Sequence, residues 1–384
     1  VEYILKKKKI GIFGDYDVDG ATSTALFGCY FKEINSLFEY YIPDRIKEGY
    51  GPNIEAFKKL KSKGCGLILT VDCGTTSNNI IEEFNKDDTQ IIIIDHHQQG
   101  DELPKGCFIV NPNRLDDKSN LKNLAAVGVS FLLIISINRK LKKMNFFKSK
   151  SIPNLLNFLD LVALGTICDV VRLDNLNRAF VKQGIKILDK TKNIGLQSLI
   201  HSSKIEKKID EYHLGYVIGP RINAGGRIGK SSKGVDLLLS EKSFHSSYIA
   251  DELTELNLER QKIEKKVEDM AIKNINNSDK IICVHGPDWH PGVIGIVAGR
   301  ITEKFAKPSI VISENHVLCK GSARSLPGFN IGSLITKACN EGILTSGGGH
   351  KMAGGLSIKI EKITEFKKFI SECTINNVIE NKKY

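Results

Sequence analysis

Hydrophobic and polar positions alternate in blocks along the first half of the chain. Residues 9–14, KIGIFG, form an apolar, isoleucine-rich run that predicts a buried strand, and residues 21–34 predict the helix that follows it. Further apolar runs predict strands at residues 67–71, 90–94 and 108–110. The run QIIII is apolar almost throughout, as is typical of a central parallel strand. Strands that alternate with helices predict a doubly wound α/β sheet.

Several longer segments predict helices. Asn123–Asn138 is the longest uncharged run, with 16 residues and an asparagine at each end. A helix needs about 20 apolar residues to span a bilayer, so we interpret this run as a buried core helix and expect no association with a membrane. Residues 78–85 and Leu155–Ile167 predict two further helices. Glu241–Asn274 is highly charged and carries apolar residues at helical spacing, which predicts a long connecting helix.

A second, smaller α/β unit is predicted after the long helix. It comprises strands at residues 280–285, 309–313 and 319–324, a helix at residues 292–305, and a glycine-rich segment at residues 346–355. A net charge of +11 and a pI of about 9.0 favour a polyanionic partner such as nucleic acid. The nine cysteines are scattered singly, without C-x-x-C spacing, so we expect reduced thiols in a cytoplasmic protein rather than a zinc or disulfide framework.

The first chemical motif is GDYDVDG, at residues 14–20, directly after the first predicted strand. Its carboxylates Asp15, Asp17 and Asp19 repel one another, so they indicate a bound cation or a neutralising base. An EF-hand loop also begins D-x-D-x-D-G, but its twelfth position would be Leu26 instead of glutamate, and no helix precedes the motif. A solvated acidic loop is the alternative. The carboxyl end of a strand favours a site, because open α/β sheets place their sites there.

Three further motifs place acids and histidines at the ends of apolar elements. Asp72 follows the second strand, where it alone could equally cap the next helix. His96 and His97 follow Asp95 at the end of the QIIII strand, and one could bind a metal while the other faces substrate. Asp169 ends an apolar helix. Together, carboxylate and imidazole ligands without thiolate predict two Mn²⁺ or Mg²⁺ ions, which activate water and stabilise the leaving oxygen in phosphoester cleavage.

The motifs GDYDVDG, VDCG, DHH and GTICDVV, in this order, resemble the signature motifs of the DHH phosphoesterase superfamily. Members that cleave pyrophosphate, cyclic dinucleotides or short oligonucleotides usually carry the motif H-x-x-x-D-x-D. This chain has Phe13 in place of the histidine, and its D-x-D-x-D-G form resembles that of the RecJ-like exonucleases. The stretches GPRINAGGRIG (219–229), HPGVIGIVAGR (290–300) and GGGHKMAGG (347–355) resemble signatures of RecJ and of a DHHA1 domain. The resemblance covers nearly the whole chain and implies a DHH domain at 1–195, a connecting region at 196–275 and a DHHA1 domain at 276–384.

Residue by residue, the resemblance implies a set of metal ligands, namely Asp15, Asp17, Asp19, Asp72, His96 and Asp169. Which of them bridges the two ions stays open. His97 resembles the second histidine of the DHH motif, which sits close to the scissile phosphate and could stabilise charge or donate a proton. Asp72 and His97 are therefore the expected catalytic residues.

Polar residues in the later signatures are predicted to bind the substrate. Arg221, Asn223 and Arg227 belong to what we interpret as a glycine-rich turn, where guanidinium groups suit phosphate oxygens and a plain surface loop is the alternative. Ser322, Arg324 and Ser325 offer hydroxyls, a guanidinium and a backbone nest for phosphate. His350 follows Gly347–Gly349, whose N–H groups could approach a phosphate if they do not form a plain tight turn. Trp289 and Tyr50 could stack on bases, although packing is the favoured interpretation.

The implied activity is hydrolysis of single-stranded DNA from the 5′ end to 5′-mononucleotides, in repair and recombination. Polarity and strand preference rest on the resemblance alone. The site is expected in a cleft between the two domains of a monomer, with a single-strand-binding protein and a helicase as partners. RecJ-like chains usually carry an oligonucleotide-binding barrel after the DHHA1 domain and a longer leader, so the sequence indicates a compact relative or a fragment. The alternatives are a phosphodiesterase of short oligonucleotides or cyclic dinucleotides, and a non-catalytic scaffold.

Overall fold

The computed structural model describes residues 1–84 and 89–376. The chain divides into two compact units, Val1–Asn257 and Leu258–Tyr384, and the division falls inside the 31-residue helix α11 (Ser243–Lys273). This helix confirms the long connecting helix predicted from the charged segment. Among the described residues, no helix is long and apolar enough to cross a membrane. The division of the chain at residues 195 and 275 stays a prediction.

The first unit is built on a parallel sheet of five strands in the order β2-β1-β3-β4-β5. The strands are β1 (Ile10–Gly14), β2 (Phe38–Tyr41), β3 (Leu67–Val71), β4 (Gln90–Ile94) and β5 (Phe108–Val110). Four of them confirm the predicted strands; the short edge strand β2 was not predicted. In the register of the sheet, Gly14 lies beside Val71 and Val71 beside Ile94. The carboxyl ends of β1, β3 and β4 are therefore level.

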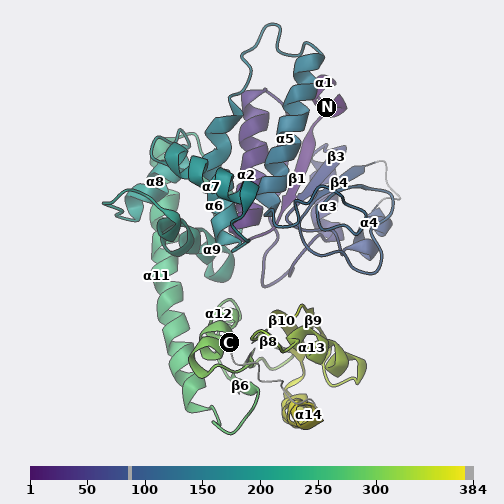
Figure 1. The fold of residues 1–384 in the computed structure, drawn as a ribbon, viewed down its shortest axis with the longest axis vertical. Coiled ribbons are helices and arrows are strands. Elements are labelled where there is room, and N and C mark those ends of the chain that lie inside the picture. The colour runs from purple at the N-terminus through teal and green to yellow at the C-terminus, as the bar shows by residue number, and fades with distance from the viewer. Residues whose placement is uncertain (85–88, 377–384) are drawn as a thin grey trace. The chain divides into compact units, whose positions relative to one another are not determined.

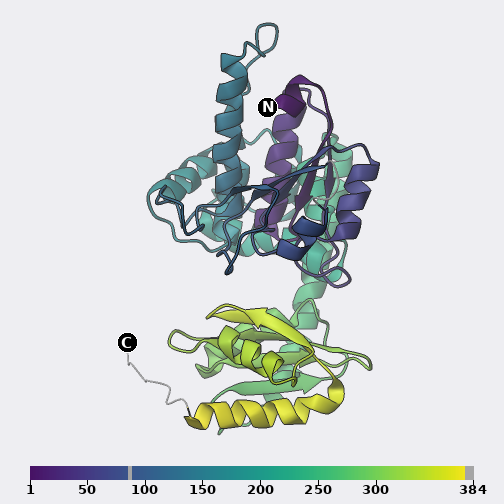
Figure 2. The same cartoon turned by 90° about the vertical axis from the view of Figure 1, so that its right-hand side faces the viewer.

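Helices cover both faces of this sheet (Figures 1 and 2). One apolar core joins the strands to α2 (Val18–Glu33), α5 (Ala126–Lys143) and α6 (Leu159–Cys168). The other joins them to α3 (Ile54–Ser62) and α4 (Asn78–Phe84). The two cores confirm the doubly wound arrangement. The last residue of the segment predicted as helix 78–85 lies outside the described residues.

The other described elements of the first unit are helices. Its elements are α1 (Glu2–Leu5), η1 (Leu155–Phe158), α7 (Asn175–Leu188), α8 (Ile194–Ser202), the π-helix η2 (His213–Ile218), α9 (Gly219–Ile228) and α10 (Lys233–Leu238). Helix α9 contains the GPRINAGGRIG stretch except its last residue, Gly229, so the predicted glycine-rich turn is wrong. Its glycines serve close packing instead: a Cβ at Gly226 would lie 3.0 Å from the carbonyl oxygen of Tyr16. The helix can approach the GDYDVDG segment only because this position lacks a side chain.

The second unit contains a mixed sheet of five strands in the order β6-β7-β8-β10-β9. The strands are β6 (Ile282–Gly286), β7 (Ser309–Ser313), β8 (Cys319–Arg324), β9 (Ser346–Gly349) and β10 (Ala353–Ile358). Helix α12 (Ile294–Phe305) and the end of α11 pack on one face, whereas α13 (Ile331–Asn340) and α14 (Ile363–Asn376) pack on the other. The short helix η3 (Ile360–Lys362) precedes α14. The predicted order of elements is confirmed, and the glycine-rich segment forms the antiparallel pair β9 and β10.

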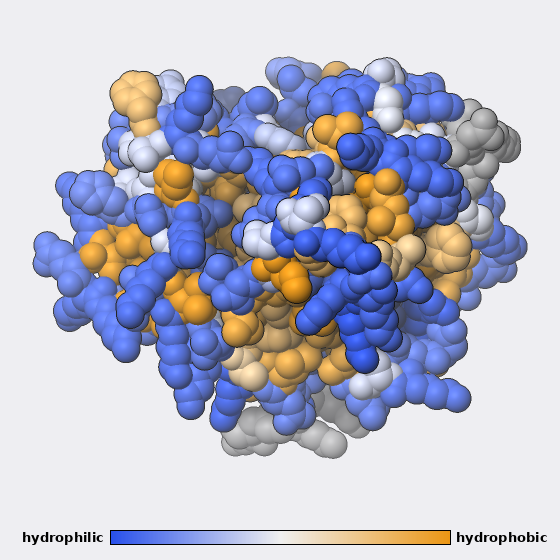
Figure 3. Space-filling model, turned by 90° about the horizontal axis from the view of Figure 1, so that it is seen from above, coloured by the Kyte–Doolittle hydropathy of each residue, from blue (hydrophilic) through white to orange (hydrophobic). Residues whose placement is uncertain are grey.

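The surface is mostly hydrophilic on the face drawn in Figure 3, with apolar areas between the charged side chains. All nine cysteines are free. Trp289 is 2% exposed, and its ring lies against the backbone of Gly286, so the packing interpretation is confirmed for this residue.

Candidate metal centre

Three acidic side chains follow the level ends of the central strands. Asp15, Asp72 and Asp95 are the first residues after β1, β3 and β4, and each is less than 5% exposed. In a parallel sheet these positions share one edge, at which open α/β proteins place their sites. The strands thus bring together residues that are distant in sequence: Asp15 and Asp72 are 57 positions apart, and Asp72 and Asp95 are 23 positions apart.

The GDYDVDG segment turns from β1 directly into α2. Asp17 caps this helix, and its Oδ1 accepts a hydrogen bond of 3.0 Å from the backbone N–H of Gly20. A Cβ at Gly20 would lie 2.5 Å from the carbonyl oxygen of Asp15, so this turn requires glycine. The helix was predicted to begin at residue 21 but begins at Val18. Asp19 therefore lies in the first helical turn, where its side chain faces the protein interior.

Asp19 and Asp169 approach the centre from the helical layer. The two carboxylate oxygens of Asp19 accept hydrogen bonds from the N–H groups of Ala126 (2.6 Å) and Val127 (2.9 Å), at the start of α5. A helix N-terminus favours such an anion. Asp169 follows the last residue of α6 and is 22% exposed through its side chain. Both carboxylates lie beside His96, whose Nε2 is 4.0 Å from Asp19 and 3.5 Å from Asp169.

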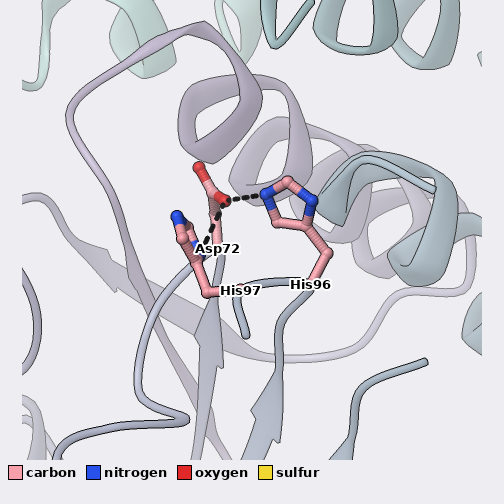
Figure 4. A group of neighbouring side chains, drawn as sticks. All are labelled: Asp72, His96 and His97. Atoms are coloured by element: carbon pink, nitrogen blue, oxygen red, sulfur yellow. Dashed lines mark ion pairs between the residues drawn. The ribbon is translucent and has the colours of Figure 1, made fainter. Parts of the chain in front are cut away.

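The two histidines approach Asp72 from different sides (Figure 4). Nε2 of His96 lies 3.4 Å from Oδ1 of Asp72, and Nδ1 of His97 lies 4.0 Å from the same oxygen. His96 is largely buried, whereas the side chain of His97 is 45% exposed. Asp72 has a φ of +63°, an uncommon conformation for a residue other than glycine. Such strain is typical of functional sites, and here it accompanies a carboxylate that two imidazoles face.

The polar atoms at this edge form three overlapping groups with the spacing of a cation site. The groups are Asp72, His96 and His97; Asp19, His96 and Asp169; and Asp15, Asp17 and Asp72. Four buried atoms in these groups have no hydrogen-bond partner, namely Oδ1 of Asp15, Oδ1 of Asp72, Nε2 of His96 and Oδ2 of Asp169. Buried polar atoms normally have partners, so these four require another ligand. Oxygen and imidazole donors fit Mn²⁺ or Mg²⁺.

The crowding of the carboxylates raises their pKa values. Burial, followed by repulsion from neighbouring aspartates, raises the pKa of Asp15 and of Asp72 well above the usual range. The same two causes raise the pKa of Asp19 to about 7 and that of Asp169 to about 9. Unlike a surface cluster, this group therefore stays charged at neutral pH only with a compensating cation.

The two histidines have opposite protonation. Burial lowers the pKa of His96 to about 4, which leaves the neutral imidazole that metals bind. Burial would also lower the pKa of His97, but the hydrogen bond with Asp95 and the nearby carboxylates outweigh it and raise this pKa to about 9. Hydrogen bonds from His97 and Thr75 likewise outweigh burial at Asp95 and hold its pKa below the usual range. His97 is thus a cation fixed beside the centre.

Sequence reasoning missed the residues that position the histidines. Oδ1 of Asp95 accepts a 2.8 Å hydrogen bond from Nδ1 of His97, and the Nδ2 groups of Asn111 and Asn113 donate to the backbone carbonyls of His97 and His96. The Tyr50 hydroxyl lies 3.2 Å from Nδ1 of His97 and donates to the carbonyl of Asp72. The sequence NPN after β5 was the one available signal for the asparagines.

The motifs also did not reveal Arg45. Its guanidinium stacks over the ring of Tyr16, at 4.7 Å from the ring centroid, and its charge lowers the pKa of the neighbouring Asp15 against the effect of burial. Arg45 follows β2, the strand that was not predicted. A cation is therefore fixed next to the first motif by a segment without any recognisable signature.

The predicted substrate-binding residues of the first unit lie in α9. Arg221 donates to the carbonyl of Val217 (2.6 Å) and to the hydroxyl of Thr254 (3.3 Å), so part of its guanidinium is occupied within the protein. Arg227 lies close enough to Tyr16 to influence its pKa, and Asn223 is partly buried in the helix. Their proposed contact with phosphate stays a prediction.

The predicted substrate-binding residues of the second unit lie on and after β8. Arg324 donates to the hydroxyl of Ser322 (3.3 Å) and to the carbonyl of Ala323 (2.9 Å). Ser325 donates to the carbonyl of Phe329 (2.8 Å) and is 6% exposed. The predicted backbone nest is wrong, because β8 is a central strand whose N–H groups pair with β7 and β10. Only side chains of Ser322 and Arg324 remain as candidates for a phosphate contact on this strand.

His350 lies between β9 and β10, and its N–H donates to the carbonyl of Ala353 (2.8 Å). Gly347–Gly349 belong to the edge strand β9, so the alternative of a plain tight turn is wrong for these glycines. Whether they and His350 bind a phosphate stays a prediction.

Comparisons with known proteins agree with this geometry. The DHH family, N-terminal domain, matches residues 9–166, and the DHHA1 domain matches residues 278–376. The single-stranded-DNA-specific exonuclease RecJ of Bacillus subtilis is 38% identical over 98% of this chain and 47% of its own length. The protein of the same name from Haemophilus influenzae is 35% identical over 97% of this chain and 67% of its own. A crystal structure of exonuclease RecJ bound to manganese superposes with a TM-score of 0.84, at 31% identity, over 98% of this chain and 92% of that one.

The similarity to these relatives extends over the fold as well as over the sequence. The chain spans about half the length of the Bacillus protein and about two thirds of the Haemophilus protein. Both domains and the region between them lie within the matched part. The chain, with its DHH and DHHA1 domains, therefore belongs to the RecJ family of DHH phosphoesterases.

Proposed function

We propose that the chain is a metal-dependent exonuclease that degrades single-stranded DNA from the 5′ end to 5′-mononucleotides, in DNA repair and recombination. The observation that carries the proposal is the set of buried carboxylate and imidazole atoms without hydrogen-bond partners at the level ends of β1, β3 and β4. The substrate and the 5′→3′ direction rest on membership of a family whose relatives are named single-stranded-DNA-specific exonucleases.

We assign two divalent cations, Mn²⁺ or Mg²⁺, to the three overlapping groups. Asp15 and Asp17 would hold one ion; His96, Asp169 and Asp19 would hold the other. Asp72 would serve both ions, because it belongs to a group with His96 and to a group with Asp15. Bound there, a pair of such ions would activate water and stabilise the leaving oxygen of a phosphodiester.

The chain's own residues orient the substrate and move protons. His97 is charged, is half exposed, and faces the centre, so it can stabilise negative charge on the scissile phosphate or donate a proton to the leaving oxygen. Asp95 keeps the ring in place through the 2.8 Å bond to Nδ1, and Nε2, which lies 3.4 Å from the Tyr50 hydroxyl, would face the substrate. The neutral His96 is in the state required of a metal ligand without prior loss of a proton.

The remaining assignments concern the strand and the cell. Arg324 and Ser322 in the second unit, and Arg221, Asn223 and Arg227 in the first, are proposed to contact backbone phosphates, with Ser325 and His350 holding the surrounding segments. The protein would act as a cytoplasmic monomer. A single-strand-binding protein and a helicase are its proposed partners on family grounds.

The test is a time course of product sizes from a single-stranded oligonucleotide with Mn²⁺, labelled at the 5′ end in one reaction and at the 3′ end in another. We expect immediate mononucleotide from the 5′ label and a shortening ladder from the 3′ label, with Asp72→Asn as the inactive control. Intact long strands beside rapid loss of a dinucleotide would instead indicate a phosphodiesterase of short oligonucleotides. Failure to bind Mn²⁺ would indicate a non-catalytic scaffold.

A further inference from the structure

Val170 has a conformation that its side chain disfavours. It follows Asp169 at the end of α6 with a φ of +58°, and its N–H donates to the carbonyl of Ile167. Helices commonly end with glycine in this left-handed position, whereas a β-branched residue there is an outlier. The side chain gains no packing in return, because it is 86% exposed. A strained apolar residue next to a proposed metal ligand indicates a function outside the folded core.

Two exposed tyrosines lie on the element that packs against the same helix end. Tyr212 and Tyr216 are 62% and 73% exposed, and their rings stack with centroids 5.1 Å apart and planes 25° from parallel. Tyr216 belongs to the π-helix η2 and Tyr212 directly precedes it. π-Helices are rare and are frequent at functional sites. The pair thus presents a ready aromatic surface to solvent.

The side of η2 that faces the protein packs against the end of α6, which is followed by the proposed metal ligand Asp169. The carbonyl of Leu214 accepts a hydrogen bond from Sγ of Cys168, the residue before Asp169. A Cβ at Gly215 would lie 3.3 Å from Ile167, and one at Gly219 would overlap Sγ of Cys168. Glycines therefore let η2 lie close against the last turn of α6. Val170 directly follows Asp169, and the two exposed tyrosines lie on and directly before η2, the element that packs against this end of α6.

We propose that Val170, Tyr212 and Tyr216 form a base-contact surface that holds the nucleobases of a single strand next to the metal centre. Carboxylates crowd the centre itself, so its rim suits the uncharged bases better than it suits the phosphates. Stacking on tyrosine tolerates any base, as an enzyme that degrades strands of any sequence requires. The surface rests on the proposed exonuclease function and adds a determinant of single-strand specificity, because bases in a duplex are not available for stacking.

The experiment compares a normal single strand with an abasic strand of equal length, in which tetrahydrofuran replaces every nucleoside sugar and base. We expect the wild type to cleave the normal strand with a higher kcat/KM. Tyr212→Ala/Tyr216→Ala should lose about tenfold or more on the normal strand through KM, since stacking on one ring contributes about 1.4 kcal/mol or more per base. The abasic strand should be affected far less, so the preference disappears. Tyr216→Phe should keep it.

Controls separate this surface from fold and from chemistry. Tyr248→Ala removes an equally exposed tyrosine from α11 and should leave cleavage unchanged. Mn²⁺ should still raise the melting temperature of the double variant. Val170→Gly should raise KM for the normal strand without a loss of melting temperature, because glycine accepts the left-handed conformation. Equal losses on both strands, or a preference that survives the double substitution, would overturn the proposal and leave a protein-binding surface as the alternative.

Failure of the exonuclease function would be visible separately. If the wild type cleaves neither strand, the proposed function is wrong, and binding of the same two strands, measured by fluorescence anisotropy without divalent metal, still decides on the surface. A wild type that binds both strands equally in that assay would also contradict the base-contact surface.

Discussion

The two sheets of the molecule differ in whether their polar side chains have hydrogen-bond partners. At the edge of the first sheet, Asp72 and His96 each carry a buried atom without a hydrogen-bond partner. On the second sheet, Arg324 donates to Ser322 and Ala323, and Ser325 donates to Phe329. A buried polar atom without a partner destabilises the fold, so it is retained where an external ligand completes it. The edge of the first sheet thus offers buried ligand atoms to a cation, whereas the second sheet holds its polar groups in fixed positions.

The origin of this difference is the direction of the strands. Parallel strands with level ends bring the residues after β1, β3 and β4 to one edge, where like charges accumulate. Strand β8 is central and antiparallel to both neighbours, so the side chains proposed to bind substrate, Ser322 and Arg324, stand on one face at alternate positions. We therefore expect chemistry to depend on the first region and substrate grip on the second.

The largest effect is expected from Asp72→Asn. The substitution removes one charge from the residue proposed to serve both ions, so hydrolysis should fall to background and the Mn²⁺-dependent rise of the melting temperature should disappear. Without metal, the variant should be at least as stable as the wild type, because repulsion among the buried carboxylates is reduced. Differential scanning fluorimetry with and without Mn²⁺, combined with the nuclease assay, measures both.

Arg324→Ala is the matched control for that experiment, since it alters the second sheet. It should retain the Mn²⁺-dependent shift. A cleanly folded Asp72→Asn protein with near-normal turnover would show that the first sheet is not the catalytic region.

The next largest effect is expected from His97→Ala. Loss of a charged proton donor beside the scissile phosphate should lower kcat about a hundred- to ten-thousandfold. The Mn²⁺-dependent shift should persist, because the groups formed by Asp15, Asp17 and Asp72 and by Asp19, His96 and Asp169 remain. Asp95→Asn should lower kcat in the same direction, since it removes the carboxylate that orients the ring. A variant of His97 that loses metal binding and activity together would indicate a ligand instead of a proton donor.

The sequence was sufficient for the strands that carry the metal centre, because an uninterrupted apolar run such as QIIII leaves little choice of structure. It was insufficient where tertiary packing decides. The run NAGG suggests a turn, yet Gly226 is helical because α9 packs against the backbone of Tyr16. The edge strand β2, with the sequence FEYY, is half exposed and lacks the apolar pattern of a buried strand.

The candidate site shows the same limit. Its acids and histidines were predicted from their positions at the ends of apolar elements and from the resemblance to the DHH motifs. The positioning roles of Asp95, Asn111 and Asn113 were not, because each role is a hydrogen bond that depends on the folded course of the backbone. Arg45 was missed for a similar reason: its position beside Tyr16 and Asp15 follows from the return of the chain after β2.

A smaller effect is expected from Arg324→Ala on strand binding. If the guanidinium contacts one backbone phosphate, the slope of log affinity against log salt should become less steep by about 0.7, the value for one phosphate of a single strand. Anisotropy titrations over a series of KCl concentrations, without divalent metal, measure the slope. Ser313→Ala, which alters a buried hydroxyl on the neighbouring strand β7, is the control and should leave it unchanged. An unchanged slope in Arg324→Ala would remove Arg324 from the phosphate grip.

The smallest effect on turnover is expected from Asp160→Asn. This substitution tests whether metal binding depends on the burial of a carboxylate or on its lack of a hydrogen-bond partner. Asp160 is 2% exposed in α6, but its carboxylate accepts hydrogen bonds from Thr191 and from the N–H of Leu161. Burial outweighs these bonds and raises its pKa to about 6. The folded state therefore holds this proton more tightly than the unfolded state, so the contribution of Asp160 to stability is present at low pH and is lost as pH rises through about 6.

From pH 4 to pH 8 the free energy of unfolding of the wild type, relative to Asp160→Asn, should fall by up to about 3 kcal/mol, since one pKa unit corresponds to about 1.4 kcal/mol. Urea titrations of both proteins at pH 4 and pH 8 measure this difference. Mn²⁺ should raise the melting temperature of both equally, because Asp160 belongs to none of the three groups with the spacing of a cation site. If the substitution reduced the Mn²⁺ response, burial itself would be the feature that attracts the metal, and the contrast between satisfied and unsatisfied polar atoms would lose its explanatory value.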